Sequence, residues 1–354
     1  MARLLWFVGF AILLPPQVQA KPWLFVSSIK DKKILAFTRD DVNGEITREN
    51  ETPCDAEPGV LYPSPDRRTL FVAMRSTGQL ASYRIQSDGK LEQLSLVDGG
   101  ADPCYFYVDR TGRFLMTAYY VANQITVHRV REDGELSKQP LQVVPTTKNA
   151  HAIHLDLADQ FAFVPHTGGN QIFQFRFDPR NGPLIPTHPK SIMLDPGDEP
   201  RHIAIHPNGR WVYSNNEAGD SLNALELDRS TGQLTRTQRI TTLREGFDPA
   251  KNTTARCEMT RDGRFIYVAN RGSDAIAAFA IDAKTGKLTS RGITDTEKTP
   301  RSLSIDPNGK YLYAAGQDNG YLRVYRIQAD GSLQSVKRYE VGPMPWCVLA
   351  VNVP

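Results

Sequence analysis

Short apolar runs separated by polar turns recur along nearly the whole chain. Each run is rich in aromatic and aliphatic residues, is bounded by turn residues and is too short for an ordinary helix, a pattern that predicts β-strands. Seven runs share this form, and they are centred on Phe25, Phe71, Met116, Phe163, Tyr213, Tyr267 and Tyr313.

A second series of strands is expected just upstream of these runs. Its segments are PGVLYPSP from Pro58, PCYFYVDR from Pro103, AHAIHLDL from Ala150, PRHIAIHP from Pro200, TARCEMTR from Thr254 and PRSLSIDP from Pro300. The run around Phe25 lacks such a preceding strand. The C-terminal segment PWCVLAVN from Pro345 has the same pattern, and we expect it to supply the missing strand.

A glycine followed two residues later by Ile or Leu recurs once in each of these units. The repeats are spaced by 45 to 54 residues and fall at Gly44, Gly89, Gly134, Gly182, Gly232, Gly286 and Gly331. Units of this length, built from short strands, are typical of a β-propeller with one four-stranded blade per unit. The sequence therefore predicts an all-β, seven-bladed propeller, closed by pairing of the C-terminal strand with the N-terminal strands.

The first 20 residues differ from the rest of the chain. Arg3 precedes an apolar stretch from Leu4 to Leu14, and Val18, Gln19 and Ala20 resemble a signal-peptidase site. We expect a signal peptide over residues 1–20, export of the protein, and one propeller domain over residues 21–354. An uncleaved membrane anchor is the alternative, although eleven apolar residues are short for a membrane span. No later window is apolar over 18 residues.

Charge and motifs exclude several functional classes. The formal net charge is only +3, with nothing that resembles a nucleic-acid footprint. No GxSxG, HExxH or P-loop motif is present. His151 and His154 lie three residues apart on an expected strand and should point to opposite faces, which argues against a shared metal. Cys54 and Cys104 either meet across neighbouring blades as a disulfide or remain free thiols.

The blade pattern also places polar residues at one mouth of the central channel, because the start of each inner strand and the end of the next strand share one rim. The starts are Gly59, Cys104, His151, Arg201, Ala255, Arg301 and Trp346, and the ends are Ile29, Arg75, Tyr120, Thr167, Glu217, Arg271 and Gln317. Several guanidinium groups around one hole repel each other unless an anion offsets their charge. We therefore expect a pocket for a carboxylated or phosphorylated small molecule.

Glu217 is the one carboxylate among these arginines. Neighbouring cations favour the ionised form of a carboxyl group, which suits a general base that accepts a proton from water or from a substrate carbon. It can equally act only as an ion-pair partner of Arg201 and Arg271.

Three segments resemble the seven-bladed lactonase family, which includes bacterial propeller-type 6-phosphogluconolactonases and fungal carboxy-muconate lactonising enzymes. They are EPRHIAIHPNGRWVYSNNE, DGRFIYVANRGSDAIAAFAID and TPRSLSIDPNGKYLYAAGQDNGYLRVYRI. The resemblance implies catalytic roles for His151, Arg201, Glu217 and Arg271. It also implies substrate-binding roles for Arg75, Tyr120, Arg301 and Gln317. The sixth inner strand departs from the family pattern, because it carries Arg256 and Glu258 where an acidic residue and a histidine are usual.

The leading hypothesis is hydrolysis of an anionic sugar lactone, without a metal or an organic cofactor. Glu217 or His151 would activate water, Arg201 and Arg271 would stabilise the oxyanion, and Arg75 and Arg301 would hold the acidic group of the substrate. One alternative is a cycloisomerase of a muconate-type dicarboxylate. Another is an exported propeller that binds a ligand without catalysis. Relatives are typically cytoplasmic, whereas this chain has an expected signal peptide.

Overall fold

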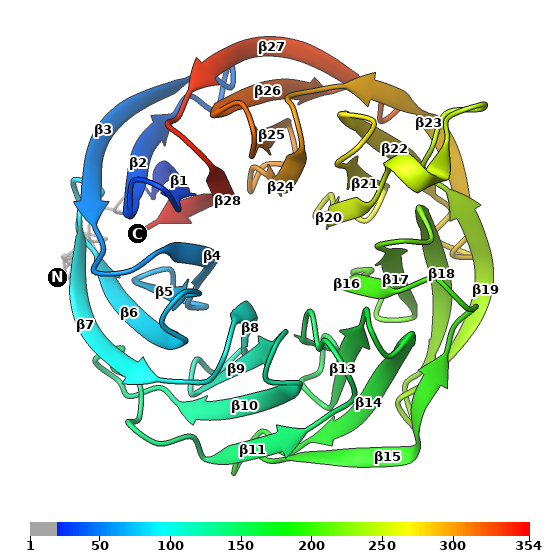
Figure 1. Cartoon of the computed structure of the whole chain (residues 1–354), viewed down its shortest axis with the longest axis horizontal. Coiled ribbons are helices and arrows are strands. Elements are labelled where there is room, and N and C mark those ends of the chain that lie inside the picture. Colours follow the sequence, from blue (N-terminus) through cyan, green and yellow to red (C-terminus); the bar gives the residue numbers. More distant parts are fainter. Residues whose placement is uncertain (1–19) are drawn as a thin grey trace, which may run out of the picture.

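The computed structural model describes residues 20–354, and these form seven four-stranded antiparallel sheets arranged in a ring (Figure 1). Each sheet is one blade, with its first strand beside the central axis and its fourth strand at the outer edge. The predicted seven-bladed all-β propeller is confirmed. The expected signal peptide falls almost entirely on residues outside this part of the chain.

The blades share one strand plan. Inner strands are β4 (Pro58–Pro63), β8 (Pro103–Val108), β12 (His154–Leu155), β16 (Pro200–Ile205), β20 (Thr254–Met259), β24 (Pro300–Ile305) and β28 (Pro345–Val353). Second strands are β5 (Thr69–Met74), β9 (Phe114–Tyr119), β13 (Phe161–His166), β17 (Trp211–Asn216), β21 (Phe265–Asn270), β25 (Tyr311–Gly316) and β1 (Lys21–Ser28). Third strands are β6 (Gln79–Ile85), β10 (Gln124–Arg129), β14 (Gln171–Phe177), β18 (Ser221–Asp228), β22 (Ala275–Ile281), β26 (Tyr321–Ile327) and β2 (Lys33–Arg39). Outer strands are β7 (Leu91–Asp98), β11 (Gln142–Pro145), β15 (Leu184–Met193), β19 (Gln233–Thr241), β23 (Leu288–Asp295), β27 (Leu333–Glu340) and β3 (Ile46–Pro53).

One blade is built from both ends of the chain. Strand β28 pairs antiparallel with β1 from Lys21↔Val353 to Ser28↔Pro345, and the sheet continues through β2 to β3. The C-terminal segment is therefore the inner strand that the N-terminal run lacks, as the sequence predicts. This pairing satisfies backbone groups of β1 that an open ring would leave exposed.

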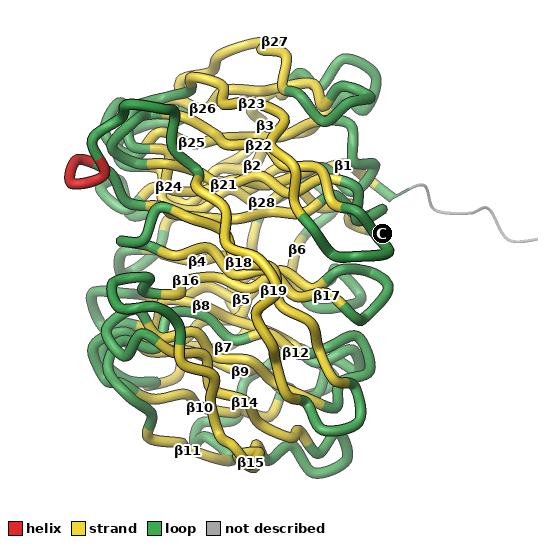
Figure 2. Tube along the Cα trace, turned by 90° about the vertical axis from the view of Figure 1, so that its right-hand side faces the viewer, coloured by secondary structure: helices red, strands yellow, loops and turns green. Residues whose placement is uncertain are grey.

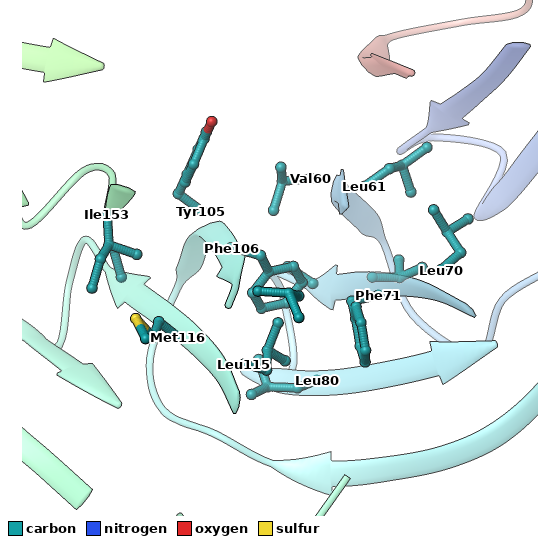
Figure 3. Close-up of a cluster of buried hydrophobic side chains, with 14 of the residues drawn as sticks. Val60, Leu61, Leu70, Phe71, Leu80, Tyr105, Phe106, Leu115, Met116 and Ile153 are labelled. Atoms are coloured by element: carbon teal, nitrogen blue, oxygen red, sulfur yellow. The ribbon is translucent and has the colours of Figure 1, made fainter. Parts of the chain in front are cut away.

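The hydrophobic core lies between neighbouring blades rather than in the channel. The close-up of one such interface shows Phe71 of β5 facing Phe106 of β8 and Leu115 of β9 (Figure 3). All three side chains are fully buried. Burial of large apolar side chains at each blade interface is the main favourable contribution to the stability of such a ring.

The repeated glycines join each blade to the one before it. Gly286, with φ of 69°, lies against the Trp211 ring, and a Cβ atom there would come within 2.3 Å of that ring. The hydroxyl of Tyr213 donates a hydrogen bond of 3.0 Å to the Gly286 carbonyl. The Gly44 and Gly331 carbonyls accept equivalent bonds from tyrosines of the preceding blades. The glycine repeat thus provides both the turn and the room for the neighbouring aromatic side chain.

The two faces of the ring differ. The one helix of the described residues, the short 3₁₀ helix η1 (Pro249–Lys251), lies among loops on one face, and the C-terminus lies on the other (Figure 2). Inner strands begin on the η1 face, so the channel mouth predicted to carry the polar residues opens there. Within residues 20–354, no helix is long and apolar enough to cross a membrane.

All four cysteines are free thiols, so the disulfide alternative for Cys54 and Cys104 is wrong. The Cys54 sulfur lies 3.9 Å from the hydroxyl of Tyr83, which belongs to β6 of the next blade. The Cys104 sulfur instead faces the Ala150 and His151 carbonyls at 3.3 Å. The two side chains point to different neighbours, because Cys104 begins an inner strand whereas Cys54 follows an outer one.

Candidate active site

A pocket opens at the channel mouth on the η1 face. We call it the mouth pocket. Its walls come from the starts of inner strands and the ends of second strands, and its lining residues are Val60, Arg75, Cys104, Tyr105, His151, Arg201, His202, Arg256, Arg301, Ser302, Trp346 and Cys347.

β-Bulges aim the inner-strand residues into this pocket. The register of β16 against β17 shifts between Pro200 and His202, which leaves Arg201 as the extra residue. The same shift occurs around Arg301 in β24. A bulge turns the extra residue away from the regular alternation of a strand. Because this bulge recurs, residues that directly follow a proline at the start of an inner strand lie at one rim of the channel.

The eight predicted site residues lie together at this mouth. Arg75, His151, Arg201 and Arg301 line the pocket. Of the other four, Tyr120, Glu217 and Gln317 each contact one of these lining residues. Arg271 contacts Glu217.

Glu217 joins two of the arginines. Its Oε2 atom lies 3.1 Å from Nε of Arg201, and its Oε1 atom accepts a hydrogen bond from Nη2 of Arg271. The Arg201 side chain is 4% exposed, and the other two are about one-sixth exposed. We call these three residues the Glu217 cluster. One carboxylate is shared by two guanidinium groups, so the cluster keeps a net positive charge.

The Trp346 ring lies against a second pair of arginines. The guanidinium carbon of Arg301 lies 3.5 Å from the centroid of the indole ring, and that of Arg75 lies 4.9 Å from it. Arg75 also forms two hydrogen bonds with Asp102, of 2.5 and 2.6 Å. Nη1 of Arg301 donates one hydrogen bond, of 3.3 Å, to Oε1 of Gln317, and Arg301 has no salt bridge within residues 20–354. We call Trp346, Arg75 and Arg301 the Trp346 cluster.

The Arg75 side chain depends on a glycine. A Cβ atom at Gly59 would lie 2.7 Å from Cγ of Arg75. The sequence pattern places Gly59 on the rim, and its contribution there is the space through which the Arg75 stem reaches the pocket.

Opposing effects set the charge of Glu217. Burial raises the pKa of its carboxyl group, but Arg201, Arg271 and Arg301 lower it more, so the net pKa is below 4.5. Burial and the surrounding arginines lower the pKa of Arg201 to about 10. Glu217 is therefore an anion and Arg201 a cation at neutral pH.

His151 is neutral at the same pH. Burial first, and then Arg201, Arg301, Arg75 and Arg271, hold its pKa well below 6.5. Its Nδ1 atom is buried without a hydrogen-bond partner within the described residues. A neutral imidazole with a free nitrogen can accept a proton or donate one.

The expectation that His151 and His154 point to opposite faces is wrong. Both rings lie on the same wall of the channel, since His151 contacts His202, and the Tyr105 ring contacts both His202 and His154 at centroid distances of 5.0 to 5.1 Å. The reason is local. The inner strand of this blade, β12, begins only at His154, so residues from His151 onward do not follow strand alternation. No group of three or more His, Cys, Asp and Glu side chains among residues 20–354 is placed to bind a metal.

The pattern missed six lining residues, and these are Val60, Tyr105, His202, Arg256, Ser302 and Cys347. Arg256 lines the pocket, whereas the aligned residue Ala255 is fully buried, because the register of β20 shifts over two residues between Thr254 and Cys257. Arg256 forms a 2.7 Å salt bridge with Glu258. Tyr105 and His202 each follow a predicted rim residue directly, and alternation alone would have turned them away from the channel.

Comparisons with known proteins point to one family. The family model described as a seven-bladed β-propeller lactonase matches residues 24–350. A 6-phosphogluconolactonase of Erwinia tasmaniensis is 35% identical over 297 residues, which cover 82% of this chain and 88% of the relative. A 6-phosphogluconolactonase of Serratia proteamaculans is 28% identical over 330 residues, which cover 93% of this chain and 98% of the relative.

A solved structure agrees with these matches. The periplasmic gluconolactonase of Pseudomonas aeruginosa superimposes with a TM-score of 0.86 at 26% identity, covering 95% of this chain and 100% of that chain.

Proposed function

The chain belongs to the family of seven-bladed β-propeller lactonases, and we propose that it hydrolyses an anionic sugar lactone in the mouth pocket. The names of its relatives, 6-phosphogluconolactonase and gluconolactonase, support a sugar δ-lactone as the substrate.

The charge of the mouth pocket carries the proposal. Five guanidinium groups lie in or next to it, from Arg75, Arg201, Arg256, Arg271 and Arg301. Within residues 20–354 they form salt bridges with three carboxylates, from Asp102, Glu217 and Glu258. Two positive charges are left without a carboxylate. A substrate with an acidic group, together with the oxyanion formed during hydrolysis, would balance both.

The Trp346 cluster is the proposed anchor for the acidic group. Arg301 is the one arginine of the pocket whose own contacts are an amide oxygen and an aromatic face, so its charge is open to a ligand. Arg75 lies across the same indole ring. Two guanidinium groups on one side of a pocket suit a phosphate or a carboxylate.

The Glu217 cluster is the proposed reaction centre. Arg201 and Arg271 converge on one point because both bind Glu217. A lactone carbonyl placed there would develop negative charge during attack by water, and these two donors would stabilise it. The C–O bond of the ring then breaks, and the ring oxygen leaves as a hydroxyl after it gains a proton.

Two side chains are candidates for the general base. Glu217 is ionised, but both of its oxygens already bind arginines. His151 is neutral and has a free nitrogen. An anionic substrate would offset the arginine charges that lower the pKa of His151, which would make it a stronger base in the complex. We propose that one of the two accepts the water proton.

Export and metal independence complete the proposal. The apolar N-terminus and the periplasmic relative from Pseudomonas aeruginosa support export of the mature chain from Lys21. Arginine side chains can supply the positive charge that stabilises the oxyanion, so we propose that hydrolysis persists after treatment with EDTA.

The test is a substrate panel with purified residues 21–354. It contains a 6-phosphorylated δ-lactone, the unphosphorylated δ-lactone and a carboxylated muconate, each assayed with the wild type, with Arg271→Ala and with Arg210→Ala. Arg210 is a matched control, because it pairs with Glu226 outside the channel. We expect rapid opening of the phosphorylated lactone, lost in Arg271→Ala and retained in Arg210→Ala. Turnover of the muconate alone would show that the protein is a cycloisomerase rather than a lactonase. No turnover of any of the three compounds would indicate a propeller that binds a ligand without catalysis.

A further inference from the structure

We propose that His202 is a positioning residue for the reaction, which holds the Arg201 guanidinium in its orientation toward the substrate through the Nε2 atom. The inference rests on the proposed function for its kinetic consequences, but its structural part can be tested without any substrate.

The contact between the two side chains fixes the state of the imidazole ring. Nη1 of Arg201 lies 2.5 Å from Nε2 of His202. A guanidinium group only donates hydrogen bonds, so Nε2 must be the acceptor. His202 is therefore neutral, and its proton is on Nδ1, which is buried without a hydrogen-bond partner within the described residues.

The surroundings of His202 keep this neutral form. Burial first, and then Arg201, His151, Arg256 and His154, hold the pKa of His202 well below 6.5. A proton on Nε2 would remove the acceptor and place a second cation beside Arg201. The acceptor is thus available throughout the neutral range.

The position of the His202 ring is also fixed by a hydrogen bond of its backbone amide and by aromatic rings that pack against it. The His202 amide donates a hydrogen bond of 3.2 Å to Oδ1 of Asn215, and Nδ2 of Asn215 reaches the Ala255 carbonyl of the next blade at 3.0 Å. The ring packs against His151 and Tyr105 at centroid distances of 5.1 Å. His202 is 5% exposed and has little freedom to move.

Arg201 is therefore held by hydrogen bonds at two of its nitrogens. Its Nε donates to Glu217, and its Nη1 donates to His202. Two hydrogen bonds at different nitrogens fix the plane of a guanidinium group, whereas one bond leaves it free to rotate. A small displacement of a group that stabilises an oxyanion lowers the rate strongly. His202 does not have to touch the substrate to affect the rate.

The kinetic test compares three variants. His202→Leu removes the acceptor, and His202→Gln supplies an amide oxygen near the position of Nε2. His154→Leu is the matched control, because the half-buried ring of His154 contacts Tyr105 and Tyr107 and forms no hydrogen bond with an arginine within residues 20–354. We expect His202→Leu to lower kcat about 10- to 100-fold with KM within about twofold. His202→Gln should recover most of kcat, and His154→Leu should keep it. Equal losses in all three variants, or a change in KM alone, would overturn the positioning role.

The structural test uses ¹⁵N NMR of the seven histidines of the chain. His202, assigned by its absence in His202→Gln, should show a protonated Nδ1 and an unprotonated Nε2 from pH 6 to 8, and an Arg201→Met variant should lose this preference. A protonated Nε2 in the wild type would refute the contact. If the wild type hydrolysed no lactone while the expected tautomer was present, the proposed function would fail and the positioning contact would stand.

Discussion

The two arginine clusters at the mouth pocket satisfy their charges differently. In the Glu217 cluster, one carboxylate pairs with both Arg201 and Arg271, and His202 accepts a second hydrogen bond from Arg201. In the Trp346 cluster, an indole ring separates Arg75 from Arg301, and Arg301 has no carboxylate partner among residues 20–354.

This difference separates two tasks that arginines perform in enzymes. A guanidinium group held by several fixed partners cannot follow a ligand, but it offers donors at a constant position, as stabilisation of a transition state requires. A guanidinium group on an aromatic face keeps its charge available and suits ground-state binding. We therefore expect substitutions in the Glu217 cluster to act mainly on kcat, and substitutions in the Trp346 cluster to act mainly on KM.

The largest expected effect is that of Glu217→Gln. The substitution removes the negative charge that Arg201 and Arg271 share, and no carboxylate remains to accept a proton. We expect kcat for a phosphorylated δ-lactone to fall about 10³-fold, with KM changed much less. The measurement is steady-state kinetics, with circular dichroism to verify the fold.

Glu226→Gln is the control for that variant, since Glu226 pairs with Arg210 on an exposed part of β18. It should leave both kinetic constants unchanged. Retention of wild-type kcat by Glu217→Gln would remove the distinction between the clusters.

Arg301→Met should produce the next largest effect. It deletes the one guanidinium group of the pocket without a salt bridge and keeps a side chain able to cover the indole ring. We expect KM for the phosphorylated lactone to rise about 10- to 100-fold, because a charge-assisted hydrogen bond is lost. KM for the uncharged δ-lactone should change little.

The matched control is Arg326→Met, because Arg326 also lies over an aromatic ring, that of Tyr311, but outside the pocket. Equal effects of Arg301→Met on charged and uncharged lactones would show that Arg301 does not recognise the acidic group.

Three histidines in or next to the mouth pocket predict a pH dependence of stability. Burial, assisted by nearby arginines, lowers the pKa of His151 and His202 well below 6.5 and that of His154 to about 3. In the unfolded chain they titrate near 6.5, so below that pH the unfolded state binds more protons and the free energy of unfolding falls. His128 and His166, whose pKa burial lowers to about 4, act in the same sense. Burial raises the pKa of three carboxyl groups, which act in the opposite sense and belong to Asp159, Glu199 and Asp220.

Each such histidine contributes about 1.4 kcal/mol per pH unit below 6.5, so we expect Tm to be on the order of 5–10 °C lower at pH 5.5 than at pH 7.5. Differential scanning calorimetry of the wild type and of His154→Leu provides the measurement, and the variant should lose part of the slope. A Tm that stays constant from pH 7.5 to 5.5 would contradict the neutral, buried state of these rings.

Trp346→Leu should have the smallest effect. The indole ring supports Arg301 but forms no hydrogen bond with it, so the guanidinium group would keep its Gln317 contact. We expect a three- to tenfold rise in KM, as for the loss of one cation–π contact, at an unchanged kcat. A loss in kcat as large as that of Glu217→Gln would mean that the two clusters act as one unit.

The sequence predicts the fold well because each blade repeats the same local signals. The glycine repeat marks a turn with positive φ, and the aromatic at the centre of a second strand reaches the glycine of the next blade in several blades. Both signals recur at similar spacing along the chain, the glycine in all seven units and the central aromatic residue in six of them.

The site is predicted in part for the same reason. Arg201 and Arg301 follow a proline at the start of an inner strand, and the bulge found there places both on one rim. The same alignment does not predict Arg256 at the rim, because the bulge in β20 spans two residues and turns Ala255 into the core. The alignment also does not predict His202 in the pocket. Its contact with Arg201 depends on a bulge that reverses strand alternation, and periodicity does not reveal a bulge.

The central claim concerns where the two ends of the substrate lie, and the most direct measurement is a crystal structure of Glu217→Gln soaked with an intact 6-phosphorylated δ-lactone. We predict density for the phosphate against Arg301 and Arg75 over Trp346, with the lactone carbonyl oxygen within hydrogen-bond distance of Arg201 and Arg271. A phosphate bound by the Glu217 cluster instead, or a lactone bound away from the mouth pocket, would contradict the assignment of the two clusters.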